Sequence, residues 1–363
     1  FQPLAKPPPE RYACRTVFRE VDGWRPGQMI WFCRCTRVSV RDVRLVNPPY
    51  WTLLLLGCDD VQIRAVTCEN PPESRNGDGI DIDCSRNVTV SDCIMRTGDD
   101  CITLRGNAWL LGDEPLPCEN VTVTNCVFSS PTCAIRVGVG DGTIRHCRFS
   151  NIVVSDTRTG VCVTSCYRRG DFSQHGAHIE QIHFSDFTMD CILPLVMTMG
   201  PEARQGAVIE DISFSRFRIV GFGGSQIVGG PGLPMRRIRL SDVEWCLQGG
   251  TDNCLYRHQK PEVFPVDGFK AFADQPGLPA ALYAVELEDC VFENIRLRWE
   301  QPAAVWRDGF YVENGRGLTF RALDLCRPCE ADGAGLRLKR AEDVRMDGCR
   351  TRTDEPDFPL YEA

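Results

Sequence analysis

The chain has 363 residues, a formal net charge of −8, and 43% hydrophobic and 25% charged residues. This composition is typical of a soluble globular protein. An acidic chain is not expected to bind nucleic acid, because that requires a basic face. No apolar run approaches the roughly 18 residues that a membrane-spanning helix needs. Residues 1–30 lack a signal-peptide pattern, because cations interrupt any apolar stretch there: Lys6, Arg11, Arg15 and Arg19.

Cysteine is unusually frequent, with 21 residues. Small disulfide-rich domains are shorter than this chain. The closest pairs, Cys33 with Cys35 and Cys326 with Cys329, lack a second Cys-x-x-Cys motif that would complete a zinc site. We therefore expect no metal and no organic cofactor, and we interpret most of the cysteines as small buried apolar side chains.

Short segments with alternating apolar and polar residues recur along the chain, and this pattern predicts strands with one buried face. They lie at 37–43, 60–66, 87–93, 120–126, 142–147, 209–214, 237–242 and 284–290. A second short strand follows in each of four repeats, at 79–83, 101–105, 134–138 and 160–164. With Val40, Ile63, Val90, Val123 and Ile144 taken as equivalent, the repeat steps are 23, 27, 33 and 21 residues. Repeats of this length without helices are typical of a β-solenoid.

The repeats predict a single all-β domain over residues 1–363, with an inner column of small side chains formed by Cys93, Cys126 and Cys147. Two stretches interrupt the repeat. Residues 1–32 are rich in proline, and we expect them to form an irregular cap on the first strand edge. Residues 248–281 are predicted to form a long loop insertion, and loops of this length usually have a function.

Acidic residues occupy matching places in two successive repeats. Asn76-Gly77-Asp78-Gly79-Ile80-Asp81 precedes one short strand, and Gly98-Asp99-Asp100-Cys101 precedes the next. Asp78 and Asp99 are 21 residues apart, so we expect them one turn apart on one face. Crowded carboxylates repel one another, so one pKa should rise while the others stay ionised, as a paired acid and base require. Ordinary turn formation and a calcium site are the alternatives for such a cluster.

These two motifs together resemble the polygalacturonases and their relatives in family 28 of the glycoside hydrolases. The resemblance extends over about residues 25–166, and flanking segments also carry it: Pro49-Tyr50-Trp51, Asp81-Ile82-Asp83 and Val88-Thr89-Val90-Ser91-Asp92. The family implies a right-handed parallel β-helix and hydrolysis of a glycosidic bond with inversion. By position, Asp99 would be the general acid, and Asp78 and Asp100 would hold and deprotonate the attacking water. Asn76 and Asp81 of the first motif would contribute to substrate binding.

The chain departs from the family at two motifs. A Gly-His-Gly is replaced by residues 131–134, which contain no histidine, and an Arg-Ile-Lys is replaced by residues 162–164. The alternation predicts that Arg105 and Arg136 point outward beside the aspartates, where they either bind a substrate carboxylate or neutralise the aspartates. Trp109 either stacks on a sugar ring or packs locally. The resemblance also implies a disulfide between Cys101 and Cys133.

We therefore expect a glycoside hydrolase that acts on pectin or another uronate-containing polysaccharide or oligosaccharide. We expect no nucleic-acid partner and no membrane insertion. Because such polymers are met outside the cytoplasm, as in cell walls, we expect a secreted or periplasmic enzyme. A calcium-dependent polysaccharide lyase and a non-catalytic carbohydrate-binding β-helix are the alternatives, and the sequence does not indicate an oligomeric state.

Overall fold

The computed structural model describes residues 25–107, 111–112, 116–165, 176–199, 206–249, 280–302, 304, 306–328, 333–351 and 359–362. These residues form 27 strands, which are joined into one continuous network of pairings. Among these residues, no helix is long and apolar enough to cross a membrane.

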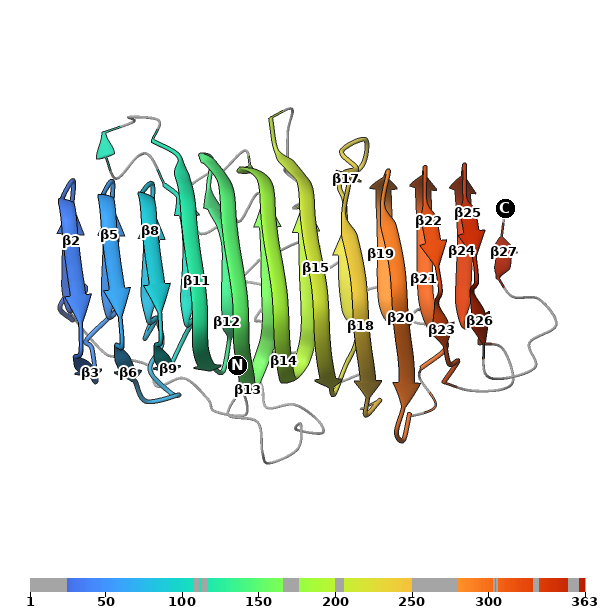
Figure 1. The fold of residues 1–363 in the computed structure, drawn as a ribbon, viewed down its shortest axis with the longest axis horizontal. Coiled ribbons are helices and arrows are strands. Elements are labelled where there is room, and N and C mark those ends of the chain that lie inside the picture. The colour runs from blue at the N-terminus through green and yellow to red at the C-terminus, as the bar shows by residue number, and fades with distance from the viewer. Residues whose placement is uncertain are drawn as a thin grey trace.

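The strands follow one another along the long axis of the molecule (Figure 1). The first half contains β1 (Ile30–Cys33), β2 (Thr36–Arg41), β3 (Arg44–Val46), β4 (Leu53–Leu56), β5 (Asp59–Arg64), β6 (Thr67–Glu69), β7 (Ile80–Asp83), β8 (Arg86–Ser91), β9 (Ile94–Arg96), β10 (Ile102–Gly106), β11 (Cys118–Ser129), β12 (Cys133–Gly140) and β13 (Thr143–Ser165). The second half contains β14 (His178–Met199), β15 (Val208–Gly221), β16 (Ser225–Val228), β17 (Met235–Arg236), β18 (Arg239–Leu247), β19 (Ala280–Glu288), β20 (Val291–Trp299), β21 (Asp308–Arg316), β22 (Thr319–Arg321), β23 (Asp324–Leu325), β24 (Leu336–Glu342), β25 (Arg345–Asp347), β26 (Arg350–Thr351) and β27 (Leu360–Glu362).

Each strand pairs in parallel with the corresponding strand of the next coil. In the first coils one sheet runs through β1, β4, β7 and β10, a second through β2, β5 and β8, and a third through β3, β6 and β9. The predicted all-β parallel β-helix is confirmed by these pairings. Three sheets around one core leave each strand with an inner and an outer face, which is the origin of the alternation in the sequence.

Residues in the left-handed backbone conformation mark the corner before the second sheet. They are Arg37, Asp60, Asn87, Asn120 and His146, with φ between 54° and 59°. Asn, Asp and His adopt this conformation more readily than most residues. The corner therefore repeats in every coil, and the strand that follows it begins in the same orientation each time.

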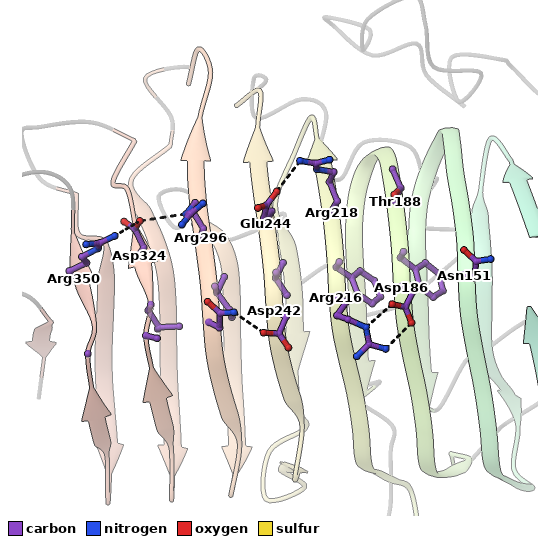
Figure 2. A pocket seen from close by; sticks show the side chains of 18 residues that line it. Asn151, Asp186, Thr188, Arg216, Arg218, Asp242, Glu244, Arg296, Asp324 and Arg350 are labelled. Atoms are coloured by element: carbon purple, nitrogen blue, oxygen red, sulfur yellow. Dashed lines mark hydrogen bonds and ion pairs between the residues drawn. The ribbon is translucent and has the colours of Figure 1, made fainter. Parts of the chain in front are cut away.

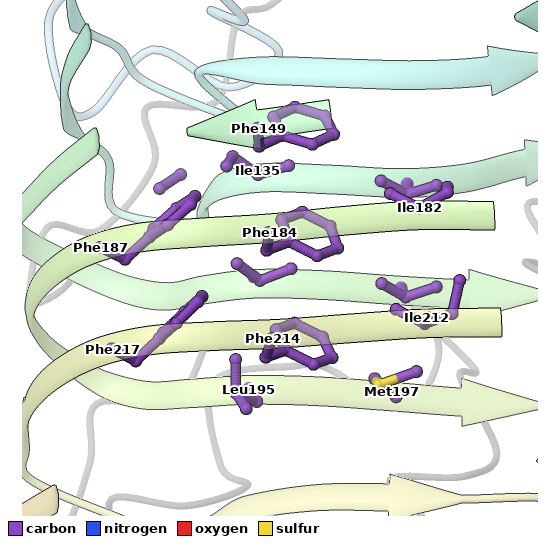
Figure 3. Packing of buried hydrophobic residues seen from close by; sticks show 14 of the residues in the cluster. Ile135, Phe149, Ile182, Phe184, Phe187, Leu195, Met197, Ile212, Phe214 and Phe217 are labelled. Carbon is purple, nitrogen blue, oxygen red and sulfur yellow. The ribbon is translucent and has the colours of Figure 1, made fainter. Parts of the chain in front are cut away.

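Aromatic side chains fill the middle of the core (Figure 3). Phe149, Phe184 and Phe214 stack along the helix axis, with ring centroids 4.9 and 5.0 Å apart. The same column continues to Val123, which pairs with Phe149 rather than with Ile144. The predicted equivalence of Ile144 with Val123 is therefore wrong. The left-handed corner lies at His146, and the alternation of inner and outer side chains starts again after that residue.

The predicted cysteine column is correct in two of its three members. Cys93 and Cys126 are buried and lie in contact on successive coils, since Ile94 pairs with Val127. Cys147 is also buried, but it pairs with Ile182 and, because Arg148 pairs with Thr122, it lies in the column of Val121 and not in that of Cys126. The same misplaced register at Ile144 explains this error.

The two expected interruptions overlap with strands at their edges. β1 begins at Ile30 and pairs with β4, and β19 begins at Ala280 and pairs with β16. Most of the expected cap (1–24) and of the expected loop (250–279) lies outside the described residues. Both assignments stay predictions.

Candidate active site

The acidic motifs lie at the start of adjacent strands of the first sheet. Ile80 of β7 pairs with Ile102 of β10, so Asp78 corresponds in register to Asp100. One turn is thus 22 residues here and not the expected 21, and Asp99 precedes the matching position by one residue. The coils approach closely at this point: a Cβ on Gly79 would lie 2.4 Å from the backbone oxygen of Cys101. Glycine is therefore required between Asp78 and the strand.

The structure brings the three predicted catalytic carboxylates together. One oxygen from each of Asp78, Asp99 and Asp100 lies within 4.8 Å of the others. Asp78 and Asp100 are 2% and 3% exposed, whereas Asp99 is partly exposed. Asp99 is therefore the member of the cluster that a molecule from solution can reach most easily.

The environments of these carboxyls shift their pKa values in opposite directions. Burial raises the pKa of Asp78 well above its usual range, and the neighbouring carboxylates raise it further. Burial and the charge of Asp100 raise the pKa of Asp99. Burial also acts to raise the pKa of Asp100, but the Arg136 guanidinium outweighs it, and the net shift is downward. A carboxyl with a raised pKa next to one with a lowered pKa is the pairing that acid–base chemistry requires.

A threonine that the sequence analysis missed supports this assignment. The Thr132 hydroxyl lies 3.0 Å from Asp99 Oδ1 and 3.0 Å from Asp100 Oδ1. A hydroxyl has one proton to donate but can also accept. Both contacts are satisfied together when protonated Asp99 donates to Thr132 and Thr132 donates to ionised Asp100. The backbone N–H of Asn76 donates to the other oxygen of Asp99, at 3.1 Å.

Arg105 is buried beneath the cluster. Its Nε donates to Asp81 Oδ1 at 2.8 Å, and its Nη2 lies 3.4 Å from Asp78 Oδ2. Its guanidinium also lies 4.3 Å from the ring centroid of Trp51. This cation–π contact stabilises more strongly when it is shielded from water, as it is here. The geometry matches the neutralising role considered for Arg105, and at 8% exposure little of this side chain is available to a substrate. The role of Trp51 was missed because no pattern in the sequence relates it to Arg105.

Arg136 is the more accessible of the two cations. Its Nε and Nη2 both donate to Asp100, and its side chain is 14% exposed. It pairs in register with Cys162, the residue that stands in place of the first cation of the missing Arg-Ile-Lys. The guanidinium contacts the sulfur of Cys162 at 3.6 Å and that of Cys133 at 3.2 Å. Arg136, one coil before Cys162, thus supplies a positive charge next to the position of the missing cation.

The remaining predicted site residues have supporting positions or are not described. The side-chain oxygen of Asn76 accepts a hydrogen bond from Arg25 at 2.8 Å. Asp83, which the sequence analysis did not select, accepts bonds from the backbone and the side chain of Asn107, both at 2.8 Å. Trp109 lies outside the described residues.

The expected disulfide between Cys101 and Cys133 is wrong, since both cysteines are free. Cys101 lies in the central core with the inner residues of the first sheet. Cys133 belongs to an outer cluster with Cys162 and Trp306. Because Ile102 pairs with Ile135, Cys101 matches Ala134, and a one-residue offset turns the two thiols to opposite faces of the sheet.

The three clustered carboxylates could in principle hold a cation. Two guanidinium groups, Arg105 and Arg136, already supply positive charge to them. This arrangement gives the calcium alternative less support than an acid–base role, because the two guanidinium groups already balance part of the charge of the cluster.

A separate groove of about 920 Å³ runs across β15, β18 and β20 (Figure 2). Its charged side chains pair with one another, for example Arg216 with Asp186 and Arg218 with Glu244. None of the predicted site residues lines it. The candidate site is therefore the aspartate cluster and not this groove.

Comparison with known proteins agrees with the geometry. Residues 19–130 match the model of Glycosyl hydrolases family 28, and this segment contains all three clustered aspartates. The match covers 112 of the 363 residues, so the similarity to this family lies in the first part of the chain. A probable polygalacturonase of Arabidopsis thaliana is 26% identical over 185 residues, which cover 43% of this chain and 41% of the relative. An exopolygalacturonase of Platanus acerifolia is 26% identical over 231 residues, which cover 58% of this chain and 56% of the relative.

The chain spans about half the length of the curated relatives it matches. Among solved structures, an exopolygalacturonase of Thermotoga maritima aligns with 76% of this chain and 54% of its own, at 17% identity and a TM-score of 0.44. A family 28 exopolygalacturonase of Yersinia enterocolitica aligns at 16% identity, over 76% of this chain and 44% of its own, with a TM-score of 0.47.

Proposed function

We propose that this protein is a glycoside hydrolase that cleaves a pectic or other uronate-containing polysaccharide or oligosaccharide. One observation carries the proposal: Asp99 and Asp100 share the Thr132 hydroxyl, and their pKa values are shifted apart. Glycosidic hydrolysis requires at least two neighbouring carboxyls, one acting as acid and one as base, and pKa values shifted in opposite directions suit these two roles. The similarity of residues 19–130 to family 28, and of the chain to polygalacturonases, supports the substrate class.

In the proposed reaction the oxygen of a water molecule forms a bond to the anomeric carbon as the glycosidic C–O bond breaks. Asp99 gives its proton to the departing oxygen, because its pKa is raised and it is the most exposed of the three. Asp100 takes a proton from the water, because Arg136 keeps it ionised. Asp78 holds the water from the neighbouring coil. General acid and base catalysis of this kind contributes about 10²–10⁴-fold each.

Inversion at the anomeric carbon rests on the family resemblance. Carboxyl groups of inverting enzymes are typically separated by roughly 6.5–9.5 Å, and the nearest oxygens here lie within 4.8 Å. Proton NMR of the first product decides the point, since the α and β anomers give separate signals. A product with retained configuration would remove inversion from the proposal and leave hydrolysis in place.

Recognition of the substrate would differ from that of relatives that carry the Arg-Ile-Lys motif. Arg136 is the candidate contact for a uronate carboxylate, since it is partly exposed and lies at the aspartate cluster. A polymeric substrate also suggests a secreted or periplasmic location.

The test uses the purified chain on a panel of polygalacturonate, other uronate glycans and neutral glycans. Hydrolysis predicts new reducing ends on at least one uronate glycan, no ultraviolet-absorbing unsaturated product, and no loss of activity in EDTA. An unsaturated product that requires calcium would identify a lyase instead. Binding to glycans with no turnover across the panel would make the chain a carbohydrate-binding β-helix.

A further inference from the structure

A column of charged side chains runs along one outer face of the β-helix. From β5 to β24 its ten members are Asp59, Arg86, Glu119, Arg145, Glu180, Glu210, Arg236, Glu288, Arg316 and Glu342. Successive members belong to adjacent coils, and the sign of the charge alternates along the column. Neighbours pair accordingly, as Arg145 does with Glu119 at 2.8 Å and Arg236 with Glu288 at 2.8 Å.

The alternation fails at one step, between Glu180 of β14 and Glu210 of β15. These residues are directly opposite each other on adjacent strands, which lie side by side in Figure 1. Like charges in that position destabilise a sheet. At the same step a histidine joins the column: His178, Glu180 and Glu210 each offer one ligand atom within 4.8 Å of the others.

The imidazole of His178 has a nitrogen that can bind a metal ion. Its Nε2 is shielded from solvent and makes no hydrogen bond, and it lies 3.4 Å from Glu180 Oε2. The His178 side chain as a whole is 39% exposed, but its shielded Nε2 makes no hydrogen bond, and a cation between Nε2 and Glu180 Oε2 would satisfy both atoms. On the other side, Arg237 contacts Glu210 Oε2 at 2.9 Å but is shared with Asp211 at 2.7 Å. Glu210 has a second carboxylate oxygen that can bind a metal ion.

We propose that His178, Glu180 and Glu210 bind a divalent transition-metal ion of the zinc type. Zinc takes imidazole nitrogen and carboxylate oxygen at about 2.0–2.2 Å in a tetrahedral arrangement, so two of its ligands lie roughly 3.3 Å apart. The 3.4 Å from His178 Nε2 to Glu180 Oε2 matches that edge. Water would occupy the fourth position. The ion would neutralise the like-charge step and link β14 to β15, so its role is structural and independent of the aspartate cluster.

The experiment measures zinc binding to the full chain by isothermal titration calorimetry, after removal of metals and alkylation of accessible cysteines. Alkylation matters because thiolates also bind zinc. His178→Ala and Glu180→Gln are compared with Glu119→Gln, which changes a glutamate of the same column that already has Arg145 as partner. Far-UV circular dichroism in EDTA checks that all variants remain folded. Cobalt substitution gives a second readout, because a nitrogen and oxygen site lacks the thiolate charge-transfer band.

The proposal predicts one zinc ion per chain with affinity reduced at least about tenfold in His178→Ala and Glu180→Gln, and unchanged in Glu119→Gln. Saturating zinc should raise the melting temperature of the wild type by about 2–5 °C and should leave that of folded His178→Ala unchanged. Wild-type protein that binds no zinc, or binds it equally well in His178→Ala, would overturn the proposal. A cobalt complex with a thiolate band would likewise assign the metal to cysteine and overturn it.

Discussion

The ion pair between Arg136 and Asp100 provides a quantitative test of the site's electrostatics. The two side chains are 14% and 4% exposed, so Arg136→Met leaves a buried carboxylate without its main partner. Breaking a buried pair in this way costs about 3–5 kcal/mol. Because Thr132 still donates to Asp100, we expect the lower end, about 3 kcal/mol.

The cost should depend on pH with a defined sign. In the folded wild type the pKa of Asp100 lies below its ordinary value of 3.8, because the effect of Arg136 outweighs that of burial. The pair therefore contributes stability above about pH 4, and this contribution is lost as the pH falls through the folded pKa. The difference between Arg136→Met and wild type should be largest near pH 7 and shrink toward pH 4, where the orphaned carboxylate becomes protonated.

Urea unfolding followed by circular dichroism at pH 7 and pH 4 measures this effect. With a slope of about 3 kcal/mol per molar urea for a chain of this size, the midpoint should fall by about 1 M at pH 7. Arg145→Met is the matched control: its ion pair with Glu119 is 39% and 15% exposed, so a loss of only about 0–1 kcal/mol is expected. The double variant Arg136→Met with Asp100→Asn should regain most of the lost stability. An equal loss at both pH values, or no recovery in the double variant, would refute the reasoning.

Two further perturbations separate the site from the core. At pH 7 or above, Asp78→Asn should raise the free energy of unfolding by about 0.5–2 kcal/mol and therefore raise the urea midpoint. The same substitution should lower the rate of glycan hydrolysis. Burial and the neighbouring carboxylates raise the pKa of Asp78 in the folded protein. Its contribution to stability is therefore present below pH 3.8 and is lost as the pH rises through the folded pKa. A lower urea midpoint in Asp78→Asn would contradict this reasoning. Phe184→Ala removes a fully buried ring stacked between Phe149 and Phe214 and should cost about 3–5 kcal/mol. Differential scanning calorimetry measures it, and a cost under about 1 kcal/mol would mean that the aromatic column is not tightly packed.

The strands and the acidic cluster could be predicted from the sequence because both depend on local patterns. Alternation in segments such as 87–93 reports a strand with one inner face, and repeated turn residues report the coil. Two acidic motifs one coil apart must then share a face. The close approach of Asp78, Asp99 and Asp100 follows from that repeat without further information.

Register could not be predicted where the corner residue changes. Asn87 and Asn120 mark the left-handed corner clearly, but in the next coil His146 takes the same backbone conformation. The change from asparagine to histidine hides the corner in the sequence, so the alternation alone matches Ile144 to Val123 in place of Phe149. The error carried through to Cys147, and an offset of one residue likewise decided against the bridge between Cys101 and Cys133.

Side-chain contacts between coils could not be predicted from the sequence for another reason. Alternation placed Arg105 on the outer face, but it could not show that Asp81 and Trp51 would enclose its guanidinium. Nor could it relate Thr132 to Asp99, since 33 residues separate them in the chain. Such contacts depend on the length of each turn, and turn length varies from coil to coil.

The central claim is that Asp99 donates the proton in glycosidic hydrolysis. Reducing-sugar release from a susceptible uronate glycan, compared between wild type and Asp99→Asn, tests it most directly. The control is Asp92→Asn, since Asn125 occupies the corresponding corner one coil later and asparagine is accommodated there. We predict that Asp99→Asn loses about 10²–10⁴-fold in rate while it remains folded, and that Asp92→Asn keeps wild-type activity. Equal rates for wild type and folded Asp99→Asn would contradict the account.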